Sequence, residues 1–361
     1  MSYLFGIITI VCFLYSLYIL LLFLALLFSK EEKNRSMDQR ASIVVPFRNE
    51  KGRLERLLES FEEMEYPKDQ FEVLLINDHS SDGSENIELT EFTFHVRIIH
   101  SSQPGKKSAL TEGINNASYG LIVQTDADCA VPKHWLSAML GELRKQDLVC
   151  GSVLFSNSWI QNLELLSYLG IGKATSNLGS PILANGANMA YRKSDFVELG
   201  GFEANRSTSS GDDIFLLRGF AKAGKSIGYY LSPDTCVITK AENSLSAFFK
   251  QRIRWAGKTS KSKHAGTIFA GVLLVLTNVA VLIQIGKWSL TGFDLQWSSI
   301  SVFSKISVDV LFLFLMALKV RVYKPLFCLP VAIALFSLYI VLVAILGVFY
   351  RPEWKNRKIQ I

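Results

Sequence analysis

The chain has 361 residues, of which 49% are hydrophobic, and a formal net charge of +6. This length allows one sizeable domain plus further elements. Much of the positive charge lies beside apolar segments, where basic residues favour the cytoplasmic side of a membrane, so it does not indicate nucleic acid as a partner. Five histidines show no paired zinc spacing, and five dispersed cysteines suit a reduced compartment.

A charge-free apolar run covers residues 4–28 and exceeds the roughly 20 residues that a membrane-spanning helix needs. The basic residues Lys30, Lys33 and Arg35 follow the run and none precedes it, whereas a cleavable signal peptide has basic residues in front. We therefore expect a retained anchor, because a buried core helix that is so long and apolar all round is unusual.

Strands and helices alternate through the middle of the chain. Short β-branched or apolar runs predict strands, and apolar residues at helical spacing predict helices. We expect strands at residues 42–46, 71–76, 96–99 and 121–125, and helices at residues 52–64, 106–117 and 211–222, with a weaker helix from Glu85. This order implies an α/β fold with a mostly parallel sheet, whose ligands bind beyond the carboxyl ends of the strands.

Polar residues gather in the loops after these strands. Asp126 and Asp128 follow an apolar run, and two carboxylates there suit Mg²⁺ or Mn²⁺ completed by substrate phosphates and water. Asp128 alternatively caps the helix that follows Pro132. Asp78 lies in a segment rich in turn-forming residues, where its carboxylate either accepts the imide N–H of a uracil ring or only stabilises the turn.

Two further features lie toward the C-terminus. Asp212 and Asp213 open a predicted helix, which indicates either stabilisation of the helix start or a general base that deprotonates an acceptor hydroxyl. Gln251, Arg254 and Trp255 lie at helical spacing in the basic, aromatic segment 244–263. They suit phosphate and sugar binding, or alternatively a membrane-interface helix with a Trp anchor.

Three more apolar segments follow, at residues 265–286, 298–318 and 326–349. The middle segment carries Lys305 and Asp309, and charges at membrane depth usually face protein or water and not lipid.

Taken together, the ordered motifs resemble the membrane-bound branch of glycosyltransferase family 2. They span about residues 42–258 and read Ile43-Val44-Val45-Pro46-Phe47-Arg48-Asn49-Glu50, Asn77-Asp78-x-Ser80-x-Asp82-Gly83-Ser84, Pro104-Gly105-Lys106-x-x-Ala109-Leu110, Thr125-Asp126-Ala127-Asp128, Asn185-Gly186-x-Asn188-Met189-Ala190-Tyr191-Arg192, Gly211-Asp212-Asp213 and Gln251-Arg252-Ile253-Arg254-Trp255. In two places the chain departs from many relatives, because Asn77 replaces a first aspartate and Asp212 replaces a glutamate.

The resemblance implies an inverting transferase with the nucleotide-diphospho-sugar (GT-A) fold and a UDP-sugar donor. It places Asp78 against the uracil, Asp213 as the catalytic base and Asp128 as a metal ligand, with Asp126 on the ribose or the metal. It also implies binding roles for the nucleotide-pocket residues Pro46, Asn49, Glu50 and Lys106, and for Gln251, Arg254 and Trp255 at the diphosphate and acceptor.

We accordingly divide the chain into an anchor and linker at residues 1–39, a cytoplasmic GT-A domain at 40–243, an amphipathic interfacial segment at 244–264, and membrane segments with a basic tail at 265–361. The few spans favour transfer of one sugar to a membrane lipid or lipid-linked glycan at the cell (inner) membrane. A processive polysaccharide synthase and a catalytically inactive scaffold are the alternatives. Three C-terminal spans would put the basic tail outside, against its preference, unless one segment is re-entrant or lies flat.

Overall fold

The computed structural model describes residues 2–29, 35–205, 211–260, 264–349, 353–354 and 357–358. Basic residues expected beside the apolar segments at positions 30, 33, 261 and 263, and the tail residues at 351 and 355, lie outside this part of the chain. The chain divides into two compact units. The sheet unit contains residues 30–157, 179–241 and 353–361, and the apolar-helix unit contains residues 1–29, 158–178 and 242–352.

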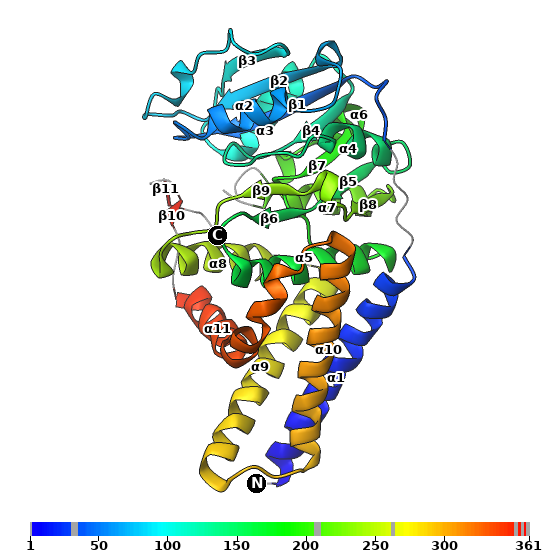
Figure 1. The fold of residues 1–361 in the computed structure, drawn as a ribbon, viewed down its shortest axis with the longest axis vertical. Coiled ribbons are helices and arrows are strands. Elements are labelled where there is room, and N and C mark those ends of the chain that lie inside the picture. The colour runs from blue at the N-terminus through cyan, green and yellow to red at the C-terminus, as the bar shows by residue number, and fades with distance from the viewer. Residues whose placement is uncertain are drawn as a thin grey trace. The chain divides into compact units, whose positions relative to one another are not determined.

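The sheet unit is built on a seven-stranded sheet with the order β3-β2-β1-β4-β7-β5-β8 (Figure 1). The strands are β1 (Ala41–Phe47), β2 (Phe71–Asn77), β3 (His95–His100), β4 (Leu121–Gln124), β5 (Leu148–Gly151), β7 (Met189–Arg192) and β8 (Ile227–Tyr230). Only β7 runs antiparallel to its neighbours, β4 and β5. The expected α/β fold with a mixed, mostly parallel sheet is therefore confirmed. A separate parallel pair joins β6 (Val153–Phe155) to β9 (Val237–Thr239).

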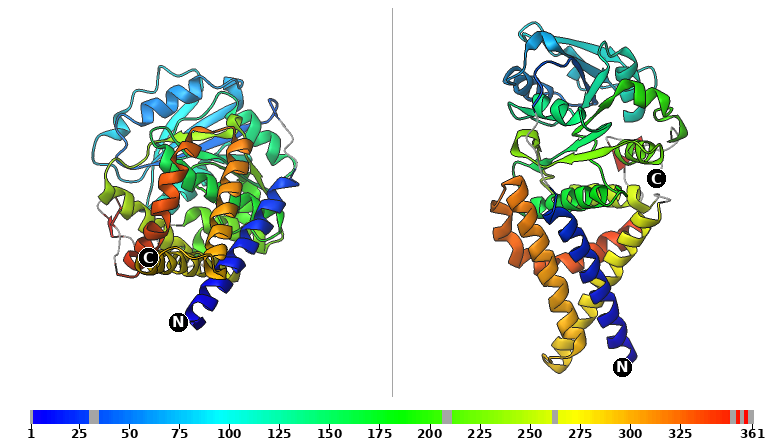
Figure 2. Two further views of the ribbon diagram at one scale, coloured as in Figure 1. Left: turned by 60° about the horizontal axis from the view of Figure 1, so that its bottom comes forward. Right: turned by 90° about the vertical axis from the view of Figure 1, so that its right-hand side faces the viewer.

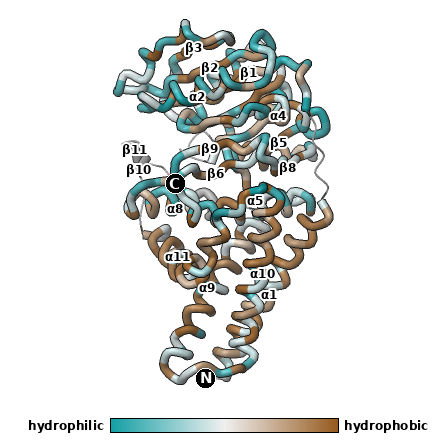
Figure 3. Tube along the Cα trace, viewed as in Figure 1, coloured by the Kyte–Doolittle hydropathy of each residue, from teal (hydrophilic) through white to brown (hydrophobic). Residues whose placement is uncertain are grey.

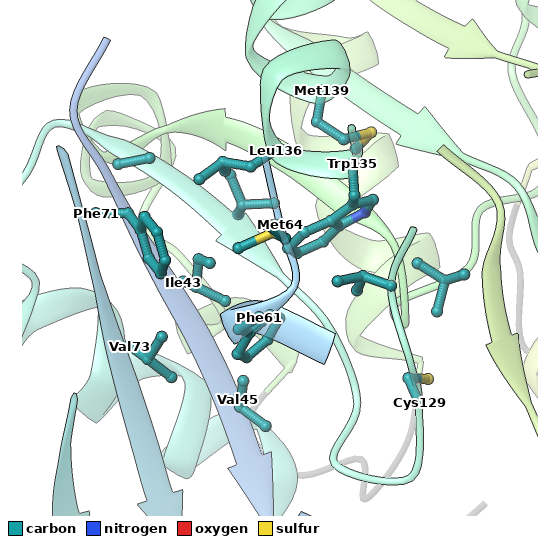
Figure 4. Packing of buried hydrophobic residues seen from close by; sticks show 14 of the residues in the cluster. Ile43, Val45, Phe61, Met64, Phe71, Val73, Cys129, Trp135, Leu136 and Met139 are labelled. Atoms are coloured by element: carbon teal, nitrogen blue, oxygen red, sulfur yellow. The ribbon is translucent and has the colours of Figure 1, made fainter. Parts of the chain in front are cut away.

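Alternating residues of the strands enter two cores, one on each face of the sheet. Ile43 and Val45 of β1 pack with α2 (Leu54–Glu62) and α4 (Trp135–Leu143), where the rings of Phe61 and Trp135 stack 6.0 Å apart (Figure 4). Val44 faces the opposite core, which holds α3 (Lys106–Asn116), α6 (Lys193–Glu198) and α7 (Asp212–Lys222). This period-2 division explains why the central strands read as continuous apolar runs.

Proline has no backbone N–H to donate to a neighbouring strand, yet Pro46 lies in a central strand. It is accommodated there because the pairing of β1 with β4 ends at Val44, while β2 pairs with β1 as far as Phe47. On the far face, Gly113 lets α3 approach the sheet, since a Cβ at that position would lie 2.6 Å from a methyl group of Val44. Gly113 thus allows close packing of α3 against Val44 of β1 and Ile76 of β2.

One sequence-based expectation for this unit is wrong. The weaker helix from Glu85 is only the short 3₁₀ turn η2 (Ser84–Asn86), after which the chain is irregular as far as β3. Apolar residues of this segment, Ile87, Leu89 and Phe92, pack against the core beside α2. Their burial by tertiary packing, together with β-branched and threonine residues of low helix propensity, outweighs the weak helical pattern.

The apolar-helix unit contains α1 (Ser2–Leu27), α5 (Trp159–Asn177), α8 (Leu245–Ser260), α9 (Ala265–Thr291), α10 (Trp297–Val320) and α11 (Leu329–Phe349). Among the residues that the structure describes, four helices of this unit are long and apolar enough to cross a membrane, at Tyr3–Leu27, Ala265–Thr291, Trp297–Val320 and Lys324–Gly347. Figure 3 shows hydrophobic residues along α1, α9, α10 and α11. These helices indicate a membrane protein and confirm the four expected apolar segments.

Helices α1, α9 and α10 pack together through a small apolar cluster that includes Ile8, Val281 and Val302 (Figure 2). The two charges expected in α10 face protein, because Lys305 pairs with Asp309 at 2.9 Å and the Tyr15 hydroxyl of α1 donates to Asp309 at 2.9 Å. Inside the bundle this pairing lowers the penalty of placing charges among apolar helices.

Helix α5 groups with the apolar helices, although its sequence lies inside the span 40–243 that we assign to the catalytic domain. Gly170 of α5 faces the side chains of Phe312 and Met316 of α10, and Asn177 donates to the carbonyl of Ala25 in α1 at 3.1 Å. The proposed limits of the four segments stay a prediction.

Candidate active site

The loops that follow β1 and β2 are joined by hydrogen bonds. Asn49 adopts a left-handed conformation with φ of 53°, which its side chain stabilises by accepting from the Ser81 N–H at 2.8 Å. The Glu50 N–H donates to the Ser84 hydroxyl at 2.8 Å, and Arg48 donates to the carbonyl of Asp78 at 2.9 Å. Three residues predicted to line a nucleotide pocket or contact its base, Asn49, Glu50 and Asp78, therefore lie on one connected pair of loops.

Asp78 connects the end of β2 to the start of α3. Its side chain is buried, and its Oδ1 accepts from the Gly105 N–H at 2.8 Å. Gly105 has φ of 117°, a backbone conformation that other residues rarely adopt, and Lys106 follows it as the first residue of α3. The carboxylate thus fixes the position from which Lys106 extends.

Lys106 is the centre of the acidic cluster. Its Nζ lies 2.6 Å from Oδ1 of Asp126 and 3.4 Å from Oδ2 of Asp212. Burial acts to lower the pKa of Lys106, but the nearby carboxylates of Asp126, Asp212 and Asp213 outweigh it and raise the pKa above its ordinary value. One cation therefore joins the loop after β4 to the start of α7.

Asp126 and Asp128 flank a tight turn. The Asp126 carbonyl accepts from the Cys129 N–H at 3.2 Å, and Ala127 between the two aspartates is buried while both aspartates are partly exposed. Burial, and then the charges of Asp128 and Asp126, raise the pKa of the Cys129 thiol well above its ordinary value, so Cys129 stays a neutral thiol in this turn.

This donor set fits a hard cation. Within the described ranges, no three His, Cys, Asp or Glu side chains form a ready-made metal site. Two partly exposed carboxylates in one turn are nevertheless what Mg²⁺ uses when substrate phosphates and water supply its remaining ligands. The side chain of Asp126 is 35% exposed, so its second oxygen is accessible to such an ion.

Asp212 and Asp213 begin α7 and are both buried. Asp212 faces the cluster, because its Oδ2 lies 3.4 Å from Lys106 and accepts from the Gln124 side chain at 3.5 Å. Asp213 accepts from the N–H of Ile214 at 2.8 Å through its Oδ1. The two neighbouring carboxylates thus have different surroundings. Asp212 contacts the Lys106 ammonium and the Gln124 amide, whereas Asp213 contacts the backbone at the start of its own helix.

Sequence reasoning gave no role to the residues that support Asp212. Gln124, at the end of β4, accepts from the Tyr191 hydroxyl at 3.1 Å and donates to the Gly186 carbonyl at 2.8 Å. Gly186 leaves room for the carboxylate, because a Cβ there would lie 2.8 Å from the Asp212 Oδ2. The sequence feature that could have indicated this supporting role is a glutamine at the end of an otherwise apolar strand.

Gln251, Arg254 and Trp255 lie on α8 of the apolar-helix unit and are partly exposed. Arg252, between them in sequence, is buried and pairs with Glu164 of α5 at 2.8 Å. The acidic cluster around Lys106 belongs to the sheet unit, so the role of the α8 residues toward it stays a prediction.

Sequence profiles of two families match the chain. "Glycosyl transferase family 2" matches residues 42–197, and "Glycosyl transferase family group 2" matches residues 121–349. The chain belongs to glycosyltransferase family 2. The family matches include every motif residue of the sheet-unit cluster as well as α8.

Individual family 2 relatives are distant. The chain is 26% identical over 219 residues to the Staphylococcus aureus "Poly-beta-1,6-N-acetyl-D-glucosamine synthase", which covers 58% of this chain and 52% of the relative. It is 24% identical over 245 residues to a Bacillus subtilis protein named "Probable glycosyltransferase YdaM", and this match covers 63% of this chain and 57% of the relative. The chain thus spans about half the length of the curated relatives it matches.

A solved structure shows the same fold over nearly the whole chain. The mannosyltransferase PcManGT from Pyrobaculum calidifontis, in complex with GDP-Man and Mn²⁺, has a TM-score of 0.65 and 18% sequence identity. The match covers 96% of this chain and 99% of that one. The GT-A fold with accompanying apolar helices is therefore confirmed.

Proposed function

We propose that the protein transfers a sugar from a nucleoside diphosphate sugar to an acceptor, with inversion at the anomeric carbon. The observation that carries this proposal is the ion-pair cluster in which Lys106 joins Asp126 to Asp212. It joins a cation suited to phosphate, Asp126 of the carboxylate pair that we propose to bind a metal, and the acidic start of α7. Diphosphate binding, leaving-group stabilisation and general-base catalysis require these groups together.

The nucleotide would lie over the joined loops after β1 and β2. Asp78 suits recognition of an N–H group on the base, and Pro46, Asn49 and Glu50 shape the adjacent loop. Family resemblance favours uridine in the donor, whereas the similarly folded mannosyltransferase is described in complex with GDP-Man. A base with a ring N–H, as both uracil and guanine have, fits a carboxylate, so the choice of UDP rests on the resemblance.

Mg²⁺ or Mn²⁺ would be held by Asp128 and Asp126. When bound, the ion supplies neutralisation of the diphosphate as it leaves. The Mn²⁺ named with the similarly folded mannosyltransferase supports this assignment. Lys106 adds a fixed positive charge 2.6 Å from Asp126, so it is placed to pair with a phosphate oxygen in the same pocket.

Asp213 is the proposed base. Asp212 is paired with Lys106 and Gln124, which supports an electrostatic and orienting role for it. Asp213, at the start of α7, would accept the proton from the acceptor hydroxyl as that oxygen attacks the anomeric carbon. Gln251, Arg254 and Trp255 would contact the diphosphate and acceptor, with the indole as an apolar platform for a sugar.

The proposed acceptor is a membrane lipid or a lipid-linked glycan, because four candidate membrane helices accompany the catalytic unit. We place the sheet unit on the cytoplasmic side of the cell membrane, beside basic flanking residues. The tail strands β10 (Glu353–Trp354) and β11 (Arg357–Lys358) group with the sheet unit. A tail on the cytoplasmic side would require one of the C-terminal segments to be re-entrant or to lie flat.

A processive synthase is the second candidate, favoured by the polysaccharide synthase among the relatives. Membranes containing the full chain should be supplied with radiolabelled UDP-sugars, and with GDP-mannose, together with lipid extract. Labelled lipid supports single transfer and labelled high-molecular-weight polymer selects the synthase. No label in either fraction from any donor contradicts the proposal.

EDTA should abolish transfer and Mg²⁺ or Mn²⁺ restore it, and full activity in EDTA contradicts the metal assignment.

A further inference from the structure

Among the described residues of the sheet unit, two residues other than glycine have left-handed backbone conformations, and they lie in the loops after β1 and β2. Asn49 has a φ of 53° and His79 a φ of 56°. A left-handed conformation is unfavourable for a residue with a Cβ, although asparagine and histidine tolerate it better than most. Backbone strain of this kind persists where the surroundings hold it, and it gathers at binding and catalytic sites. His79 therefore needs contacts that hold its backbone in place.

Arg48 supplies these contacts. Its Nη1 donates to the carbonyl of Asp78 at 2.9 Å and to the carbonyl of His79 at 3.1 Å. Successive carbonyls of an extended strand point in opposite directions, so one nitrogen can reach both only where the chain turns. Because hydrogen bonds from a guanidinium are stronger than those from neutral donors, this pair of bonds stabilises the turn at His79.

The turn at His79 joins the two loops. Just after the turn, the Ser80 hydroxyl accepts from the Asn49 N–H at 3.1 Å. Just before it, Asp78 donates its N–H to the carbonyl of Phe47 at 2.8 Å. The left-handed conformation of the residue between these two contacts thus sets the geometry between the Asp78 carboxylate and the loop that contains Asn49.

The imidazole of His79 contributes less to this geometry than its backbone does. The side chain is 47% exposed, and its Nδ1 lies 3.5 Å from Oδ1 of Asp78, which is longer than a typical hydrogen bond. The same carboxylate oxygen accepts from the Gly105 N–H at 2.8 Å. Glycine at position 79 would adopt a φ of 56° without the penalty of a Cβ, so the turn requires a backbone conformation and not a particular side chain.

We propose that Arg48 is a positioning residue for nucleotide recognition, which holds the left-handed turn at His79 and so fixes Asp78 toward the base of the donor. This inference rests on the proposed function, since it assumes that Asp78 contacts the nucleobase. Arg48 acts through the backbone of the loop, whereas the diphosphate would be bound by Lys106 and the metal-binding carboxylates. Loss of Arg48 should therefore weaken recognition of the base and leave binding of the diphosphate intact.

The test compares UDP with pyrophosphate, which carries the diphosphate but no base, as ligands of the detergent-solubilised full chain in the presence of Mg²⁺. Isothermal titration calorimetry measures both affinities, and GDP replaces UDP if the wild type binds only GDP. Arg48→Met should weaken nucleotide binding about 5-fold to 30-fold, the range that corresponds to the penalty of a left-handed residue with a Cβ. Pyrophosphate affinity should stay within about twofold of the wild type.

Substitutions of His79 separate its backbone conformation from its side chain. In the Arg48→Met background, His79→Gly should restore nucleotide affinity to within about threefold of the wild type, because glycine adopts the turn unaided. His79→Ala is the matched control, since it also removes the imidazole but keeps a Cβ, and it should restore nothing.

His79→Val leaves Arg48 in place, so it tests the turn even if Arg48→Met fails to fold. A β-branched residue is strongly disfavoured at positive φ, and this variant should weaken nucleotide binding at least as much as Arg48→Met. Arg144→Met, which removes a surface ion pair with Asp38 in the same unit, is the control for loss of a guanidinium and should bind the nucleotide like the wild type.

Unchanged nucleotide affinity in Arg48→Met or in His79→Val, with a wild type that binds UDP or GDP, overturns this proposal and leaves the proposed function standing. So does an equal loss of nucleotide and pyrophosphate affinity in Arg48→Met, or an equal effect of His79→Gly and His79→Ala in its background. A wild type that binds the nucleotide but transfers no sugar overturns the proposed function, and the binding data still decide this proposal. A wild type that binds neither UDP nor GDP overturns both.

Discussion

Replacing Lys106 by methionine should destabilise the sheet unit and abolish activity, because it leaves the acidic cluster without its cation. Asp212 is nearly inaccessible, with a side chain 6% exposed, whereas the Asp126 side chain is 35% exposed and partly screened by solvent. Breaking a buried ion pair costs about 3–5 kcal/mol, and an exposed pair contributes about 0–1 kcal/mol. We therefore expect a loss of about 3–4 kcal/mol, most of it from Asp212.

For a domain of this size, such a loss lowers Tm by roughly 6–16 °C. Thermal unfolding of the detergent-solubilised chain, followed by near-ultraviolet circular dichroism, would measure it. Lys107→Met is the matched control, because it removes the neighbouring lysine, whose Nζ lies 4.3 Å from the centroid of the Phe215 ring. A Lys106→Met variant with the Tm of the wild type would refute the argument that Lys106 neutralises a buried acidic cluster.

Three further predictions concern the residues around the site. Gly186→Ala should reduce turnover by about 100-fold with a small change in Tm, because a Cβ 2.8 Å from Oδ2 of Asp212 displaces that carboxylate. Unchanged turnover in an initial-rate assay would contradict this. Asn188→Ala should lower the unfolding free energy by about 3–5 kcal/mol, since it removes the acceptor of the buried Trp135 Nε1–H at 2.9 Å and the side-chain donor to the Thr235 carbonyl at 2.7 Å, and a melting curve that overlays the wild type would contradict it. Asp147→Asn should destabilise the chain at pH 7 but not in acid. Burial acts to raise the pKa of Asp147, but hydrogen bonds from Ser226 and the Arg192 guanidinium outweigh it and lower the pKa, so the contribution of Asp147 to stability is present above the unfolded pKa and is lost as pH falls below about 4. A variant whose Tm deficit is the same at pH 7 and in acid would show that the charge of Asp147 plays no part.

Much of the first half of the sheet unit could be predicted from periodicity alone. Residues 42–46 are a short β-branched run and residues 71–76 a mostly apolar one, and they become the buried strands β1 and β2. The spacing of Leu54, Leu57, Leu58 and Phe61 places one face of α2 in the core. The candidate membrane helices at residues 4–28, 265–286 and 326–349 were equally clear, because no globular core explains charge-free runs of their length, whereas the segment 298–318 carries Lys305 and Asp309. The local sequence pattern is therefore sufficient to predict an element that buries one of its faces in the core.

Later elements depend on partners that are distant in sequence. The strands β5, β7 and β8 are only four residues long and pair in an order that no local signal specifies. Helix α5 reads as part of the middle domain, yet small and polar residues such as Gly170 and Asn177 fit it against α10 and α1.

The candidate site likewise combines residues that the sequence indicated with contacts that only the fold reveals. The acidic residues were found because carboxylates at strand ends and helix starts are conspicuous, and Lys106 was found only through the resemblance. Their grouping by Lys106 could not be read from the sequence, since 20 and 106 positions separate it from Asp126 and Asp212. Gln124 and Gly186 act on Asp212 through contacts that exist only in the folded sheet.

The most direct test of the proposed chemistry is the turnover and UDP affinity of Asp213→Asn beside those of Asp212→Asn and Asp78→Asn. General-base assistance contributes about 10²–10⁴ in rate. Asp213→Asn should therefore lose kcat by about that factor while UDP affinity survives, because the base contacts the acceptor and not the nucleotide. Asp212→Asn should lose less turnover, and Asp78→Asn should weaken UDP binding first. Near-normal turnover in Asp213→Asn, or a larger loss in Asp212→Asn, would contradict the assignment of the base and with it the account of the site.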